Sequence, residues 1–220
     1  MPSQPRTVVC FGDSNTFGSI PTVLRGMGHR LGPDRRWPGI LKRKLGVTWS
    51  VIEEGHPSRT TVHDDPVEGH HLNGLRALPI VMETHMPIDI VVLSLGVNDL
   101  KYRFSLTALD VSDSVEVLVR EIKQSPWGPS GAPPQLLVVA PPPMQLVGRF
   151  AETFRGGDEK SKVLGGHMAE MAERQDVLFL DAGTIVETSA VDGLHLDSGA
   201  HRELGVAIAA MIADHFHERR

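Results

Sequence analysis

Short apolar stretches alternate with longer amphipathic segments along most of the chain. Five stretches of four to eight residues are rich in Val, Ile and Leu and are bounded by Gly, Asp or Pro. This pattern is typical of strands that are buried on both faces of a sheet. The predicted strands cover Thr7–Phe11, Trp49–Ile52, Ile88–Leu95, Leu136–Ala140 and Val177–Leu180.

The segments between these strands have the periodicity of helices. Pro38 falls in the first turn of the first segment, where a missing N–H costs nothing. The last segment carries Leu204, Ile208 and Ile212 on one face. The alternation predicts an α/β fold, namely a flavodoxin-like three-layer sandwich with a five-stranded parallel sheet and helices on both faces. The predicted helices cover Trp37–Leu45, Leu72–His85, Ala108–Ile122, Asp158–Arg174 and Ser198–Phe216.

No linker divides the chain. The stretch Ser125–Pro134 is rich in Pro and Gly, but it only joins a predicted helix to the next strand. A chain of 220 residues is long enough to bury a core without disulfides or metals. We therefore predict a single domain that spans residues 1–220.

Charge and cysteine content exclude several classes of protein. The chain has 22 basic and 27 acidic residues and a net charge of −5, which argues against nucleic acid or an anionic membrane as a partner. Its one cysteine excludes an intrachain disulfide and a cysteine-based metal site. No apolar run is long enough for a membrane helix, and the N-terminal stretch lacks the apolar core of a secretory signal. We expect a cytoplasmic protein that forms a homo-oligomer and needs no cofactor or metal.

Polar side chains follow four of the five predicted strands. Ligands bind beyond the carboxyl ends of the strands in such sheets, so these side chains are the candidates for a site. A serine hydroxyl is a weak nucleophile that needs a base, which a histidine can supply near neutral pH. A carboxylate can orient that histidine, and an amide can stabilise an oxyanion. The residues that offer these groups are Ser14, Asn98, Asp192 and His195.

Four sequence blocks resemble those of the SGNH/GDSL hydrolase superfamily. The blocks are FGDSNTFG, EEGHPSRTT, LGVND and DGLH, in the family's order and at the predicted strand ends. RRWPGIL, HMPIDIVV and the prolines of the fourth strand end make the chain most similar to the small bacterial arylesterase and acyltransferase branch. The resemblance implies that Ser14 is the nucleophile, that His195 is the general base and then acid, and that Asp192 orients it. It also implies an oxyanion hole made by the N–H groups of Ser14 and Ser58 and by Nδ2 of Asn98.

Two positions depart from the family pattern. Asn15 stands where the first block usually has leucine, and Ser58 stands where the second block usually has glycine. A shifted alignment would place Gly55 at that oxyanion position instead of Ser58. We expect Asn15 to contact the substrate because it lies beside the nucleophile. Trp37 is suited either to the wall of the acyl pocket or to packing at the start of its helix.

The sequence thus predicts a serine esterase that hydrolyses short-chain aryl and alkyl carboxylic esters through an acyl-enzyme on Ser14. Acyl transfer to alcohols or peroxide is a second outcome of the same chemistry. Alternatives are a carbohydrate O-acetyl esterase or an acyl thioesterase with the same triad. An ordinary α/β-hydrolase is disfavoured because no G-x-S-x-G motif occurs. A flavodoxin-like module would bind phosphate or flavin at residues 13–16, but it leaves Asn98, Asp192 and His195 without a role.

Overall fold

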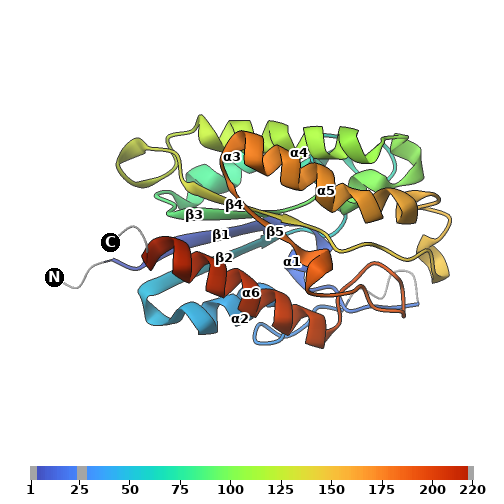
Figure 1. Ribbon diagram of the computed structural model, residues 1–220, viewed down its shortest axis with the longest axis horizontal. Coiled ribbons are helices and arrows are strands. Elements are labelled where there is room, and N and C mark those ends of the chain that lie inside the picture. Colours follow the sequence, from blue (N-terminus) through green and yellow to red (C-terminus); the bar gives the residue numbers. More distant parts are fainter. Residues whose placement is uncertain (1–3, 24–28, 218–220) are drawn as a thin grey trace.

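Five parallel strands form one sheet between two layers of helices (Figure 1). The structure is a computed structural model that describes residues 4–23 and 29–217. The strands lie in the order β2-β1-β3-β4-β5, which is the flavodoxin-like order, so the predicted fold class is confirmed. Their bounds are Arg6–Gly12 for β1, Trp49–Gly55 for β2, Ile90–Ser94 for β3, Gln135–Ala140 for β4 and Leu178–Asp181 for β5.

The two helical layers cover opposite faces of the sheet (Figure 1). One layer contains α3 (Gly74–His85), α4 (Ala108–Lys123) and α5 (Gly157–Gln175), and the other contains α2 (Trp37–Leu45) and α6 (Ser198–His217). None of the helices in the described parts of the chain is both long and apolar enough to cross a lipid bilayer.

The central strands supply side chains to both cores in strict alternation. In β1, Val9 and Phe11 belong to the core under α3, α4 and α5, whereas Val8 and Cys10 belong to the core under α2 and α6. The same alternation runs along β3 and β4. Successive side chains of a strand point to opposite faces, so a sheet covered on both sides needs continuous apolar runs.

The prediction that all five strands are buried on both faces is wrong for the two edge strands. The residues of β2 and β5 are mostly half-buried, whereas the middle of β1, β3 and β4 is fully buried. An edge strand has a neighbour on one side only, and the helices cover it incompletely. One helix also begins later than predicted, because a 3-10 turn at His70–Leu72 precedes α3 and Asn73 caps that helix.

A short helix that the sequence pattern did not predict lies beyond the carboxyl end of β1. This helix, α1 (Ser14–Phe17), begins after Asp13, whose Oδ1 accepts a hydrogen bond of 2.9 Å from the N–H of Asn15. Four residues are too few to show a helical period. In Figure 1, α1 lies at the end of the sheet away from the labelled N and C ends of the chain.

The opposite end of the sheet joins the first strand to the last helix. The guanidinium of Arg6 lies 4.8 Å from the ring centre of Phe216 and 5.4 Å from that of Trp49. Both rings also contact each other edge to face, with their centres 4.9 Å apart. The start of β1 and the end of α6 are therefore neighbours at the end of the sheet that lies away from α1 (Figure 1).

Candidate active site

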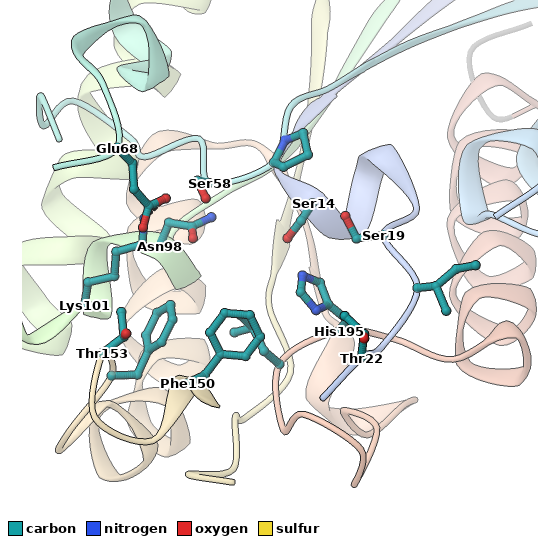
Figure 2. A pocket seen from close by; sticks show the side chains of 14 residues that line it. Ser14, Ser19, Thr22, Ser58, Glu68, Asn98, Lys101, Phe150, Thr153 and His195 are labelled. Atoms are coloured by element: carbon teal, nitrogen blue, oxygen red, sulfur yellow. Dashed lines mark hydrogen bonds and ion pairs between the residues drawn. The ribbon is translucent and has the colours of Figure 1, made fainter. Parts of the chain in front are cut away.

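The carboxyl ends of the strands border a cavity of about 520 Å³. Ser14, Ser58, Asn98 and His195 line it together, although they come from four separate strand ends (Figure 2). Figure 2 shows the side chains of Ser14 and His195 pointing into this space toward one another. The structure therefore brings together the candidates that the sequence placed at four different points of the chain.

His195 is held by a buried carboxylate. Its Nδ1 lies 2.8 Å from Oδ2 of Asp192, and the same oxygen accepts a hydrogen bond of 3.0 Å from the N–H of Thr22. The other carboxylate oxygen accepts the N–H groups of Leu194 and His195, at 3.1 and 3.0 Å. Burial raises the pKa of Asp192, but the hydrogen bonds and the nearby imidazole outweigh it and hold the pKa below its usual value. An ionised carboxylate only accepts hydrogen bonds, so Nδ1 carries a proton and a neutral His195 has its basic nitrogen at Nε2.

Ser14 is the first residue of α1, directly after the cap. Asp13 does not line the cavity, and its carboxylate holds the turn from β1 into α1. Burial raises the pKa of Asp13 to about 6, although the Asn15 N–H and the charges of His195 and Arg59 lower it. Gly18 ends the helix with a φ of 86° and donates its N–H to the carbonyl of Ser14 at 2.8 Å. These contacts fix the backbone on which the Ser14 hydroxyl is presented.

Two further donors border the cavity near Ser14. Asn98 lies in a 3-10 turn after β3, and its Nδ2 donates one hydrogen bond of 3.1 Å to the carbonyl of Arg59. An amide nitrogen has two N–H donors, so a second one remains for a ligand. Ser58 has a φ of 63°, a conformation that favours glycine and costs other residues roughly 1–2 kcal/mol. Gly55 does not line the cavity. It packs against α1, where an added Cβ would lie 2.1 Å from the backbone nitrogen of Phe17.

Asn15 and Trp37, which the sequence suggested as substrate contacts, do not line the cavity. Asn15 is 8% exposed, and its amide binds the backbone of the segment that carries His195. Trp37 is fully buried in the core between α2 and α6. Of the two roles weighed for Trp37, the structure gives it the packing role. The amide of Asn15 is thus bound to the protein backbone, and the ring of Trp37 is packed in the core.

The cavity has a charged side that the sequence blocks do not predict. Lys101 and Glu68 line it, and Nζ of Lys101 lies 3.1 Å from a carboxylate oxygen of Glu68 and 3.1 Å from one of the buried Asp65. Arg103 binds the other oxygen of Glu68 at 2.9 Å. Burial raises the pKa of Glu68, but the Ser58 hydroxyl and the Lys101 ammonium lower it by more than burial raises it. The pKa is therefore below its usual value, and the carboxyl stays ionised. Lys101 lies three residues after Asn98, and this proximity is the one feature of the sequence that indicates a charge near the cavity. The acidic partners of Lys101 lie more than thirty residues earlier, so no local pattern links them to it.

The remaining wall of the cavity is apolar and lies beside His195. Phe150 and Phe154 come from the segment after β4, and Leu194 precedes the histidine. The rings of Phe150 and His195 meet edge to face, with centres 5.7 Å apart. The cavity thus has polar and apolar parts: in Figure 2, Glu68 and Lys101 lie across the space from His195, and Phe150 lies between Lys101 and His195.

Two histidines outside the cavity lining have polar partners close to their ring nitrogens. His70 pairs with Asp64 at 3.1 Å, and Nε2 of His63 lies 3.2 Å from Oγ of Ser114. Within residues 4–23 and 29–217, no three His, Cys, Asp or Glu side chains are placed to hold a metal ion together.

Comparison with known proteins identifies the family of the chain. Residues 10–203 match the GDSL-like Lipase/Acylhydrolase family. The native aryl esterase of M. smegmatis is 38% identical, with a TM-score of 0.91, and the match covers 95% of this chain and 99% of that one. Est24, a carbohydrate acetylesterase from Sinorhizobium meliloti, is also 38% identical, with a TM-score of 0.90 and the same coverage. A carbohydrate acetylesterase family member from Sinorhizobium meliloti is 35% identical, with a TM-score of 0.87, over 94% of this chain and 97% of that one.

No curated protein sequence matches the chain. The family match spans most of the residues, and the chain therefore belongs to the GDSL-like lipase/acylhydrolase family. This confirms the resemblance found in the sequence blocks. It makes the protein a carboxylic ester hydrolase and excludes the flavodoxin-like binding module as its function.

Proposed function

We propose that the protein hydrolyses short-chain carboxylic esters with Ser14, His195 and Asp192 as its catalytic triad. The observation that carries the proposal is the 2.8 Å contact between His195 and Asp192, with His195 and Ser14 bordering the same cavity. Serine esterases need this arrangement, in which a carboxylate fixes the imidazole and the imidazole activates the hydroxyl.

In the acylation step, Oγ of Ser14 attacks the ester carbonyl carbon while Nε2 of His195 takes the hydroxyl proton. Asp192 stabilises the imidazolium that forms. The tetrahedral intermediate then expels the alcohol or phenol, which takes the proton from His195, and an acyl-enzyme remains on Ser14. An aryl leaving group needs less help from that proton than an alkyl one.

Charge develops on the carbonyl oxygen during this step, and donors must already be in place to stabilise it. We assign this role to Nδ2 of Asn98 and to the backbone N–H groups of Ser14 and Ser58. Ser58 is preferred over Gly55 because Ser58 lines the cavity, whereas Gly55 packs against α1. Its conformation, with a φ of 63°, also explains why relatives with glycine at this position would be less strained.

In the second step, water attacks the acyl carbon while Nε2 of His195 takes one of the water protons. The bond between the acyl carbon and Oγ of Ser14 then breaks, the carboxylic acid leaves, and His195 returns the proton to Oγ. An alcohol or hydrogen peroxide in place of water would give a new ester or a peracid. Acyl transfer therefore depends on which acceptor the cavity holds, and its polar side supports binding of a hydroxyl group. Product analysis in the presence of added alcohol measures the ratio of transfer to hydrolysis.

The triad is tested by replacement and labelling of the nucleophile. A serine-directed phosphonate should attach once, at Ser14, and abolish activity. Ser14→Ala should lower kcat by at least about 10³-fold, because removal of a triad member leaves only binding and oxyanion stabilisation. Ser19→Ala is a matched control, since Ser19 also borders the cavity but has no role in the proposed triad. Labelling at another serine, or an active Ser14→Ala protein, would contradict the triad.

A second candidate function is deacetylation of carbohydrates. The charged side of the cavity, made by Glu68 and Lys101, supports it, because carboxylate and ammonium groups bind the hydroxyls of a sugar. The similarity to Est24 points the same way. Glu68→Gln should reduce kcat/KM for an acetylated monosaccharide at least tenfold more than for p-nitrophenyl acetate. Equal losses for both substrates would favour the simple aryl ester.

Other expectations from the sequence stay predictions. These are the single domain over residues 1–220, the acyl thioesterase alternative, the cytoplasmic location and the homo-oligomer. Light scattering after gel filtration measures the oligomeric state, and an acyl-CoA assay measures thioesterase activity.

A further inference from the structure

Asn15 replaces the leucine that usually follows the nucleophile, and its side chain links α1 to the segment that carries His195. We propose that Asn15 is a positioning residue, which fixes the distance between the Ser14 hydroxyl and the His195 imidazole. This inference rests on the proposed triad, because it concerns how two of its members are held together.

The link consists of two hydrogen bonds to the backbone on either side of His195. Nδ2 of Asn15 donates to the carbonyl of Leu194 at 3.2 Å, and Oδ1 accepts the N–H of Leu196 at 3.0 Å. The amide thus spans the histidine residue as a bridge, with one contact before it and one after it. Asn15 is adjacent to Ser14 in α1, so the nucleophile and the base are attached to one rigid unit.

The bridge is buried, and its loss would be costly. Asn15 is 8% exposed, Leu194 is 4% exposed and Leu196 is 1% exposed. A leucine at position 15 has the branched shape of asparagine but makes neither bond, which would leave a carbonyl and an N–H without partners away from water. The segment would then shift to satisfy them.

A shift of this kind acts on the reaction through geometry. Asp192 fixes the imidazole of His195, and α1 fixes the position of Ser14. Asn15 connects α1 to the segment that carries His195. A misplacement of about 1 Å between reacting groups can lower a rate about 10²-fold. Asn15 does not line the cavity, so substrate binding should change little.

Two variants separate positioning from general stability. Asn15→Leu and Asn15→Ala both remove the bridge, and the alanine leaves room for water. The matched control is Asn73→Leu, because Asn73 is 5% exposed and its amide binds the Val62 carbonyl at 2.8 Å and the Arg76 N–H at 3.3 Å, away from the cavity. Each protein is assayed with p-nitrophenyl acetate well below its own melting temperature.

Both Asn15 variants should lower kcat 10- to 100-fold and leave KM within about threefold, whereas Asn73→Leu should keep kcat within about threefold. Phosphonate labelling of Ser14 should slow in parallel with kcat. The downfield proton NMR signal of Nδ1–H in His195 should shift or broaden in the Asn15 variants and stay unchanged in Asn73→Leu.

The proposal is overturned if the Asn15 variants keep kcat within threefold, or if Asn73→Leu loses as much activity as they do. It is also overturned if neither Asn15 variant folds, since the side chain would then be a folding element. An active Ser14→Ala protein would instead contradict the triad itself, so the two failures are distinguishable.

Discussion

Asp192 accepts four hydrogen bonds, two through each carboxylate oxygen. Asparagine has only one side-chain oxygen and can accept at only one of these two sites. In Asp192→Asn, the amide carbonyl can keep the N–H groups of Leu194 and His195. The amino group then faces the N–H of Thr22 and Nδ1 of His195, where the carboxylate oxygen stood. The opposite orientation would set the amino group against two backbone N–H groups, so the first orientation is favoured.

The favoured orientation changes the tautomer of His195. Nδ1 now faces a donor and must accept, which moves the imidazole proton to Nε2, on the side of Ser14. A protonated Nε2 cannot take the proton of the serine hydroxyl. In other triads this change lowers kcat about 10⁴-fold, which corresponds to about 5.5 kcal/mol of transition-state stabilisation.

The assay is steady-state hydrolysis of p-nitrophenyl acetate from pH 5 to 9. Asp192→Asn should lose about 10⁴-fold in kcat with a small change in KM. Asp181→Asn is the control, because Asp181 caps a turn by accepting the N–H of Gly183 at 2.9 Å and lies outside the cavity. If Asp192→Asn kept more than a tenth of the wild-type kcat, the carboxylate would not set the tautomer and the argument would be wrong.

Three further predictions address the donors, the acyl pocket and pH. Asn98→Ala should lower kcat about 10²–10³-fold with little change in KM, and Ser58→Gly should stay within about threefold of wild type because its N–H remains. Across p-nitrophenyl esters, kcat/KM should peak between acetate and butyrate and fall more than about tenfold by octanoate, since each methylene left unburied forfeits up to about 0.8 kcal/mol; a maximum at eight carbons or longer would contradict this. Burial lowers the pKa of His201 from 6.5 to about 4, so the folded protein binds fewer protons than the unfolded chain between these pH values, and stability from this residue is lost as the pH falls. The free energy of unfolding should therefore change by about 3 kcal/mol less between pH 7 and 4 in His201→Gln than in wild type, as measured by urea denaturation.

The sheet and its main helices were predictable because their signals are local. A parallel sheet covered on both faces needs continuous apolar runs, and the runs in β1, β3 and β4 are the clearest in the chain. The edge strands were placed correctly but were expected to be more buried than they are. Burial at an edge depends on what the neighbouring elements leave uncovered, which no local pattern records.

The sequence predicted only those site residues whose side-chain chemistry and position after a strand indicate a catalytic role. Ser14, Asn98 and His195 were found from their residue types and their places after strands. The contacts of Asn15 lie about 180 residues away in sequence, and nothing local distinguishes a bridging asparagine from one that binds a ligand. Lys101 was missed for a similar reason, because a lysine is expected in solvent unless its buried acidic partners are known.

Arg6 contacts Phe216 at the end of the sheet opposite the cavity, and this contact has a practical consequence for protein engineering. It places the beginning of β1 and the end of α6 side by side, away from the cavity. A short linker could join these two elements, and new chain ends could be opened in a surface connection such as the one before β4. Attachment of the enzyme to a solid support through this end of the molecule would likewise leave the cavity facing the solution. The ester substrate should then still reach the immobilised enzyme.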